Sequence, residues 1–296
     1  GYLCELLIIK YGNFIDALKS ISKWRIPHVV TIGDVPKHEV KLLFKLFKDS
    51  ALIFPDPVDL KRNAAAAVSK RSVSLAIVAS TCFLTNPSDV FFFPRREPAS
   101  IEELSKYVVD SKRCLSFIVL KINEGLMPDV LWGVLKRFLK RGENIISQFN
   151  FKVIDSRIWS DERELAVVFY ETESCNLSEY KLHEGPPPYV KGNLSKFINK
   201  YLGDRSVFGP WISNDGRPYV LRRRKYTEIT DVLYREVVGK LPKGFTVIDI
   251  VVNTLTRIPG RLLVDRNFAY WLTEAVLKVP SWMVSGCRSD SSSSTL

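Results

Sequence analysis

The stretch LSFIVLK, residues 115–121, decides the fold of the middle of the chain. This short apolar run, rich in β-branched and aromatic residues, predicts a buried strand. Pro128 then begins a predicted helix with one apolar face, and Gly142 is expected to end it. Residues 149–159 and 164–171 follow as two predicted strands. The order strand, helix, strand, strand matches part of a ferredoxin-like α+β body, expected here with a mixed sheet.

The residues before this body predict a mainly helical segment. Apolar side chains recur at helical spacing in three stretches, and two short apolar runs between them predict strands. The helices are expected at 1–12, 13–25 and 38–49, and the strands at 28–32 and 51–54. Asn63 is expected to cap a further helix that runs through the alanines toward Phe83. Because the chain opens in mid-helix and without Met, we expect it to be the C-terminal part of a longer polypeptide.

Other local signals divide the rest of the chain. Ser100 and Glu103 form a capping box ahead of a helix, and HEGPPPYV (183–190) predicts a stiff linker. A hairpin is expected around Asn214-Asp215-Gly216, with a helix before it and another over 228–240. The expected domains are a helical segment (1–95), a body (96–182, with 245–283 as a candidate completion), a small basic α/β tail (183–244) and a disordered end (284–296).

Composition points to a polyanionic partner. The 296 residues contain 43 Lys or Arg and 32 Asp or Glu, so the formal charge is +11. No apolar run approaches the ~18 residues that span a bilayer, and no membrane association is expected. The five cysteines are scattered without a CxxC pair, and none has a histidine at ligand spacing. We therefore expect neither a zinc site nor a disulfide framework, and a reducing cytoplasm as the compartment.

The positive charge is concentrated near the end of the chain. Residues 181–240 hold twelve Lys or Arg and six Asp or Glu, a local balance of +6. Clustered cations beside exposed aromatic side chains suit a phosphate backbone. The alternative is an edge strand that its charges protect against aggregation. The candidate RNA-binding residues here are Lys191, Lys196, Arg217, Arg222, Arg223, Arg224 and Lys225.

The residues of several common catalytic sites are missing from the sequence. Two-metal nucleotidyl transfer needs paired carboxylates, commonly Gly-Ser followed by Asp-x-Asp, and the chain contains neither. Glu162 and Glu164 are spaced as a pair but lack the preceding glycine turn. There is also no phosphate-binding glycine loop and no nucleophile elbow. We assign no catalytic or metal-binding residue, and the chain resembles a binding body rather than a complete enzyme.

Several segments, taken in order, resemble the archaeal, class I CCA-adding enzymes (tRNA nucleotidyltransferases). The resemblance covers most of residues 1–240 and is specific, because one such motif would be weak and several in order are strong. The first two motifs are also similar, more loosely, to poly(A) polymerases and oligoadenylate synthetases. The segments are GYLCELLIIKYGNF (1–14), DPVDLKRNAAAAVS (56–69), FLTNPSDVFFFP (83–94), GPPPYVKGNLSKFINKY (185–201) and RRRKY (222–226).

The resemblance implies an architecture of head, neck, body and tail, of which this chain holds the later neck, the body and the tail. It implies addition of C, C and A to the tRNA 3′ end from CTP and ATP with Mg²⁺. The metal-binding carboxylates would lie in a missing head domain, so the chain alone is expected to be inactive. The body and tail would bind the acceptor–TΨC arm of tRNA, and a homodimer stays open.

The segment KRN, residues 61–63, gives the candidate nucleotide site by the same resemblance. Arg62 would recognise the base and primer end, since a guanidinium offers planar, paired donors. Asp59 and Asn63 would shape the loop, and Lys61 would contact backbone phosphate. Leu60 stands where the family usually has proline, which favours a looser turn. The alternative for Arg62 is an ordinary surface arginine.

Two other readings remain for the whole chain. One is a free-standing RNA-binding protein or subunit without catalytic activity. An in-frame upstream sequence with Gly-Ser and Asp-x-Asp would exclude it. The other is a different member of the same superfamily, such as a poly(A) polymerase, which the resemblance in the tail argues against.

Overall fold

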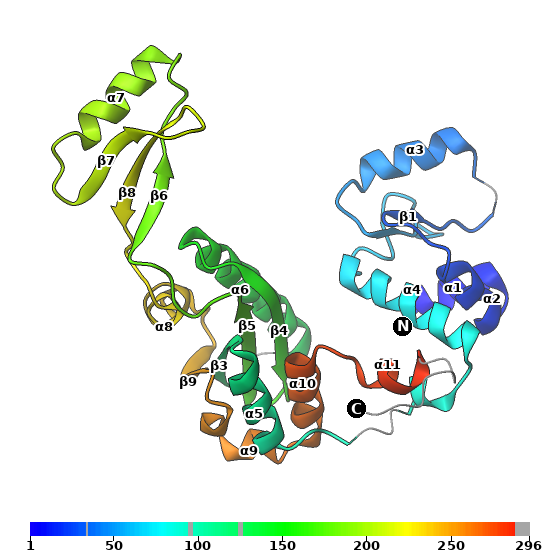
Figure 1. The fold of residues 1–296 in the computed structure, drawn as a ribbon. Coiled ribbons are helices and arrows are strands. Elements are labelled where there is room, and N and C mark those ends of the chain that lie inside the picture. Colours follow the sequence, from blue (N-terminus) through cyan, green and yellow to red (C-terminus); the bar gives the residue numbers. More distant parts are fainter. Residues whose placement is uncertain (34, 94–96, 124–126, 288–296) are drawn as a thin grey trace. The chain divides into compact units, whose positions relative to one another are not determined.

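The computed structural model describes residues 1–33, 35–93, 97–123 and 127–287 (Figure 1). The chain forms two compact units, residues 98–277 and residues 1–97 with the chain from residue 278 onward. The α+β class is confirmed, because helices and antiparallel sheets are both present. Within the described residues, none of the helices combines the length and apolar character needed to cross a bilayer.

The first unit is mainly helical. A two-stranded parallel pair, β1 with β2, lies among its helices, and its core includes Leu6, Trp24, Phe54 and Val73. The elements are α1 (Tyr2–Tyr11), α2 (Phe14–Ile21), β1 (His28–Val29), α3 (Lys37–Leu46), β2 (Leu52–Ile53), α4 (Lys70–Thr85), the 3₁₀ turn η1 (Asp89–Phe91) and α11 (Ser281–Gly286).

Two expectations for this unit are wrong. Helix α4 begins at Lys70 and not at Asn63, because the side chain of Ser69 accepts from the Ser72 N–H and caps the helix there. The expected disordered end at 284–296 overlaps α11, which continues to Gly286. The final stretch, 288–296, lies outside the described residues.

The second unit is built on a four-stranded sheet in the order β4-β5-β3-β9. Its strands are β3 (Cys114–Ile122), β4 (Val153–Ser160), β5 (Leu165–Thr172) and β9 (Phe245–Val252). The mixed sheet was a wrong expectation, since all three strand pairs are antiparallel. A helix follows β3 and another precedes β9, so the connections keep the strand–helix–strand–strand–helix–strand order of a ferredoxin-like sandwich.

Helices cover both faces of this sheet. One face packs against α6 (Pro128–Gln148), α8 (Ile229–Val232), the π-helical turn η2 (Leu233–Val237) and η3 (Val238–Lys240). The other packs against α5 (Ile101–Ser111), η4 (Leu255–Arg257), α9 (Gly260–Leu263) and α10 (Arg266–Leu277). Along β3, Ile118 and Leu120 face the first layer, and Phe117 and Val119 face the second. Double coverage explains why LSFIVLK is apolar without alternation.

Gly142 does not end its helix. Helix α6 runs on to Gln148, and Gly142 lies inside it against the hydroxyl of Tyr170 on β5. A Cβ at this position would collide with that hydroxyl, which donates to the Leu139 carbonyl at 3.2 Å. The glycine is therefore needed for the close approach of helix and sheet, and not for a turn.

The tail is an insertion between β5 and β9. It comprises β6 (Tyr180–Glu184), α7 (Lys191–Tyr201), β7 (Val207–Ile212) and β8 (Pro218–Arg223). The strands form an antiparallel sheet in the order β6-β8-β7, and α7 lies across one of its faces (Figure 1). The contacts beneath α7 come from Phe197, Tyr201, Val207 and Val220. The linker expected at 183–190 is in part strand, because β6 extends to Glu184.

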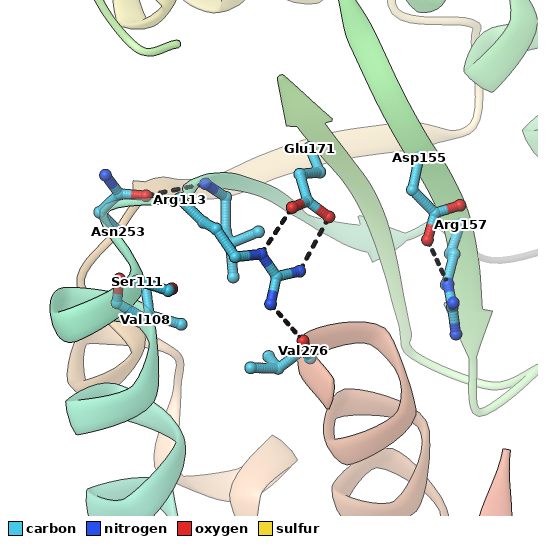
Figure 2. Close-up of polar contacts among 9 residues, drawn as sticks. Val108, Ser111, Arg113, Asp155, Arg157, Glu171, Asn253 and Val276 are labelled. Atoms are coloured by element: carbon cyan, nitrogen blue, oxygen red, sulfur yellow. Dashed lines mark hydrogen bonds and ion pairs between the residues drawn. The ribbon is translucent and has the colours of Figure 1, made fainter. Parts of the chain in front are cut away.

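A buried ion pair joins three elements of the second unit. Figure 2 shows the Arg113 guanidinium facing the Glu171 carboxylate on β5 and the end of α10. Its Nε and Nη2 donate to the two carboxylate oxygens at 2.6 and 2.9 Å, and Nη1 donates to the Val276 carbonyl. The Glu171 side chain is only 3% exposed. The paired hydrogen bonds to the carboxylate are the main cause that raises the pKa of Arg113.

The expectation of no disulfides is also wrong. Cys82 pairs with Cys287 inside the first unit, and Cys114 pairs with Cys175 inside the second. The two pairs are separated by 205 and 61 residues along the chain, yet their Cα atoms lie 4.9 and 5.2 Å apart. Spacing along the sequence could not reveal pairs that only the fold brings together. Cys4 is free and exposed.

Candidate nucleic-acid interface

The loop after β2 is held closed by its own backbone. The Asp56 N–H donates to the Arg62 carbonyl at 2.9 Å, and the Arg62 N–H donates to the Asp59 carbonyl at the same distance. The Asp59 carboxylate accepts from the Lys61 N–H at 3.0 Å. These bonds do not use the side chains of Lys61 or Arg62. Either side chain can therefore be substituted without opening the loop.

Asn63 fixes the base of this loop. Its side-chain oxygen accepts from the N–H groups of Phe54 and Ala65, each at 2.9 Å. Its amide nitrogen donates to the Leu52 carbonyl at 3.0 Å and to the Ser50 hydroxyl at 3.2 Å. Because Asn63 is buried and its oxygen and nitrogen are both engaged, its contribution is to shape the loop rather than to touch a ligand.

We expect Asn63→Ala to lower the free energy of unfolding by about 2–3 kcal/mol, because it leaves buried backbone groups without partners. Urea denaturation followed by circular dichroism measures the change. The matched control is Asn199→Ala, at an exposed position of α7, which should stay within about 0.5 kcal/mol of the unsubstituted chain. Equal losses of unfolding free energy for the two substitutions would contradict the role of Asn63 in fixing the base of the loop.

Asp56 is a further part of the loop, although it was not among the predicted site residues. It is 5% exposed, and its Oδ1 accepts from the Val58 N–H at 3.0 Å and the Tyr2 hydroxyl at 3.1 Å. The bond from Val58 is the main cause that holds the pKa of Asp56 below its ordinary value. Asp56 Oδ2 lies 3.9 Å from Arg62 Nε, so a carboxylate faces the candidate guanidinium.

Arg62 itself is accessible. Its side chain is 70% exposed, and the neighbouring Lys61 and Asp59 are exposed too. On the same loop, Pro57 and Leu60 line an apolar cavity of about 430 Å³. The structure therefore brings Asp59, Lys61 and Arg62 together on one exposed loop that Asn63 holds from within.

Three of the predicted tail cations form ion pairs with acidic side chains. Arg217 pairs with Glu184 at 2.6 Å, Arg223 with Glu179 at 2.7 Å, and Lys225 with Glu236 at 2.6 Å. These acidic partners were not part of the sequence-based prediction. Each of the three pairs is at least partly exposed, and a phosphate can compete for such cations. Lys191 and Lys196 are exposed on α7.

Three of the predicted cations share one hollow. Arg223, Arg224 and Lys225 line a polar cavity of about 640 Å³ at the end of β8, together with Tyr226 and Thr227. Arg224 Nη1 donates to the Asn150 side chain at 2.9 Å, while its buried Nε has no hydrogen-bond partner within the described residues. Strand β8 ends at Arg223, so Arg224 and Lys225 lie just beyond the strand.

A second group of cations surrounds Tyr201. The Lys200 ammonium lies 5.2 Å from the centre of the Tyr201 ring, and the Arg222 guanidinium lies 5.7 Å from it. The ring of His183 is 5.8 Å from the same ring. Burial, followed by the charges of Arg222, Lys181 and Lys200, lowers the pKa of His183. Lys181 and Lys200 thus join Arg222 in one positive region, although only Arg222 was predicted as a site residue.

The described residues do not offer a metal site. No group of three or more His, Cys, Asp or Glu side chains in that part of the chain could hold an ion. The donor set therefore does not fit the Mg²⁺ that the resemblance implies, and we derive no step through a metal bound to these residues.

Comparisons with known sequences cover both units. The profile "tRNA nucleotidyltransferase, second domain" matches residues 1–93, and the profile "CCA-adding enzyme, C-terminal domain" matches residues 104–254. The second match includes the body sheet and the whole tail, and it covers just over half of the chain.

Named relatives agree with the profiles. A CCA-adding enzyme of Pyrobaculum islandicum is 39% identical over 233 residues, which are 79% of this chain and 50% of the relative. One of Saccharolobus solfataricus is 35% identical over 243 residues (81% and 52%), and one of Sulfurisphaera tokodaii is 31% identical over 283 residues (96% and 59%). The chain spans about half the length of the curated relatives it matches. This chain belongs to the archaeal family of CCA-adding enzymes.

Proposed function

We propose that this chain takes part in the addition of CCA to the 3′ end of tRNA from CTP and ATP. Its tail and body would bind the acceptor–TΨC arm, and the loop with Arg62 would form part of the nucleotide pocket. The observation that carries the proposal is the match of one C-terminal-domain profile across residues 104–254, which include the basic cavity at Arg223, Arg224 and Lys225.

Each set of residues has a distinct task in this proposal. Arg222 to Lys225, Arg217, Lys191 and Lys196 would hold the phosphate backbone of duplex RNA, which proteins recognise by shape and phosphate contacts. Arg62 would serve the base edge and a phosphate together. The carboxylates that bind Mg²⁺ would come from a domain outside these residues. The reaction would take place in the cytoplasm, and a homodimer is compatible with it.

The chain should bind an RNA minihelix that reproduces the acceptor and TΨC arms. The logarithm of the affinity should fall linearly with the logarithm of salt concentration, because bound phosphates release counterions. The purified chain alone should not incorporate CTP or ATP into that RNA. Fluorescence anisotropy measures the first property, and radiolabelled nucleotide incorporation measures the second. Salt-independent binding would contradict the phosphate contacts, and incorporation by the chain alone would place catalytic carboxylates within it.

A non-catalytic RNA-binding protein is the second candidate, favoured by the lack of Gly-Ser and Asp-x-Asp in the sequence. The intact mass of the native polypeptide separates the two. A mass well above 33.8 kDa, with an in-frame Asp-x-Asp, would establish the catalytic enzyme. A native chain of this mass that binds RNA and has no catalytic partner would establish the second candidate.

A further inference from the structure

The tail is joined to the body by a short stem of two paired segments. Residues 173–179 leave the body after β5, and residues 224–229 return to it after β8. At the body end, the Ile229 N–H donates to the Cys175 carbonyl at 2.9 Å. Two more backbone hydrogen bonds, each of 2.8 Å, continue the pairing toward the tail: Leu177 N–H to the Thr227 carbonyl and Arg224 N–H to the Glu179 carbonyl.

The disulfide Cys114–Cys175 fastens the body end of this stem. Cys114 begins β3, a central strand of the body sheet, and is 2% exposed. Cys175 belongs to the outgoing segment of the stem, shortly after β5. Since the carbonyl of Cys175 also accepts from Ile229, this one covalent bond fixes the outgoing segment directly and the returning segment through that hydrogen bond.

The stem carries the basic cavity to which the proposed function assigns RNA phosphates. Leu177 and Glu179 line the cavity from the outgoing segment. Arg224, Lys225 and Thr227 line it from the returning segment. A cavity built from both segments keeps its shape only while they stay paired. The disulfide is therefore placed to determine how well these cations are preorganised for a ligand.

A second cavity leads to the disulfide. Both cysteines line it, and its volume of about 420 Å³ suits a small molecule. Cys175 is half-buried whereas Cys114 is almost fully buried, so we expect a reagent to reach the sulfur of Cys175 first. Lys112, Arg113 and Glu173 also line the cavity, which therefore carries charges of both signs.

Asn253 supports the sulfur of Cys175. Its side-chain nitrogen donates to Cys175 Sγ at 3.3 Å, and its side-chain oxygen accepts from the Leu115 N–H at 2.7 Å. The second bond orients the amide so that its N–H groups face the sulfur. A hydrogen-bond donor stabilises a thiolate more than a neutral disulfide sulfur, so Asn253 favours the release of Cys175 as a thiolate.

We propose that Cys114–Cys175 is a thiol–disulfide exchange site that takes a dithiol as its reductant and controls how firmly the stem is held. While the disulfide is intact, the two segments of the stem are fixed to β3. After reduction, backbone hydrogen bonds alone keep them paired, and the basic cavity loses part of its preorganisation. Weaker RNA binding after reduction is the consequence, and this consequence rests on the proposed function.

Reduction takes two exchange steps. The first thiolate of the dithiol attacks Cys175 Sγ, the Sγ–Sγ bond breaks, and its electron pair leaves with Cys114 Sγ, which takes up a proton. The second thiolate of the dithiol then attacks the reagent sulfur of this mixed disulfide. Cys175 Sγ leaves with the electron pair and takes up a proton. The protein gains two electrons and two protons, and the dithiol becomes a disulfide.

The test uses the full 296-residue chain with Cys4→Ser, Cys82→Ser and Cys287→Ser, so that Cys114 and Cys175 are the only cysteines. The folded protein is treated with oxidised glutathione and then with dithiothreitol. Alkylation and intact mass should count no thiol after the first treatment and two after the second, without denaturant. Reduction should then speed hydrogen exchange at the amides of Leu177 and Ile229 by about 10-fold or more and leave the middle of β5 unchanged. Affinity for the RNA minihelix should fall by about 3-fold or more.

The matched control is the chain with Cys114→Ala and Cys175→Ala, which keeps the other three cysteines. Its stem amides should exchange fast with and without dithiothreitol, and circular dichroism checks that each variant is folded. Two thiols after oxidation, reduction only in denaturant, or unchanged hydrogen exchange of the stem amides after reduction would each overturn the inference while the proposed function stands. Faster hydrogen exchange with unchanged minihelix affinity would overturn the control of RNA binding. Failure of the oxidised chain to bind the minihelix overturns the proposed function, and the thiol counts and hydrogen exchange then still decide whether this is an exchange site.

Discussion

Arg113→Met is expected to lower the free energy of unfolding of the second unit by about 3–5 kcal/mol, the largest stability loss that we foresee for a single substitution in the chain. The Glu171 carboxylate is 3% exposed, and Arg113 supplies two hydrogen bonds to it. Removing the guanidinium takes a cation and two hydrogen bonds from this buried carboxylate, and it also takes the Nη1 hydrogen bond from the Val276 carbonyl at the end of α10. Urea denaturation monitored by tryptophan fluorescence measures the change.

The stability that Arg113→Met loses should depend on pH in a direction that the chemistry of a buried carboxyl group determines. Without Arg113, the buried Glu171 carboxyl loses two hydrogen bonds and the cation that stabilise its charged form, and desolvation disfavours that form. A carboxyl group with a raised folded-state pKa destabilises the fold above that pKa, and protonation relieves the penalty as the pH falls. The stability deficit of Arg113→Met should therefore shrink toward low pH. A deficit that is constant with pH would show lost packing rather than an uncompensated charge.

Two further variants make the test specific. Arg113→Met combined with Glu171→Leu should recover much of the loss, since apolar groups can replace a buried ion pair at little cost. Lys152→Met breaks the pair with Glu173, whose side chains are 74% and 63% exposed, and it should cost less than about 1 kcal/mol. A double variant as unstable as Arg113→Met alone would contradict the account based on unpaired charge.

The parts of the fold that local chemistry specifies were predictable from sequence. The capping box of Ser100 and Glu103 is present with both of its hydrogen bonds, which join residues only three apart. The strand at 115–121 was equally clear, because burial on both faces leaves a continuous apolar run. The expected α+β class followed from these local patterns.

The features that were missed depend on distant partners. A glycine late in a helical pattern predicts a helix end, but Gly142 is needed for contact with the Tyr170 hydroxyl, which lies on a strand of the sheet. The sequence predicts a helix cap at Asn63, whereas its side chain bonds back to Ser50, Leu52 and Phe54. A sequence pattern states what a residue type can do, and only the fold decides which partner it meets.

The same division holds for the candidate site. Charge counting located the basic tail but could not show that Glu179, Glu184 and Glu236 pair with three of its cations. It also passed over the aromatic residues that pairing of β6, β8 and β7 brings to one face of the tail sheet, because these strands are separated in the sequence and β7 contains a bulge. Strand pairing supplied that information.

Arg62→Ala in the complete enzyme is expected to lower kcat/KM for nucleotide addition by about 10- to 150-fold. This range corresponds to the loss of charge-assisted hydrogen bonds worth about 1.5–3 kcal/mol. The loop should keep its shape, because backbone bonds and Asn63 hold it and the Arg62 side chain is 70% exposed. The free energy of unfolding should therefore change by less than about 0.5 kcal/mol.

The prediction separates nucleotide recognition from RNA binding. Affinity for the tRNA minihelix should stay within about two-fold of the unsubstituted enzyme, because the tail supplies most phosphate contacts in this proposal. Arg62→Lys should restore only part of the activity, since an ammonium lacks paired planar donors. Arg25→Ala, at another exposed arginine of the same unit, controls for the loss of a charge and should leave kcat/KM unchanged. Equal losses of nucleotide addition and of minihelix affinity in Arg62→Ala would instead make Arg62 an RNA contact, because a residue of the nucleotide pocket acts on the incoming CTP or ATP and not on the bound stem.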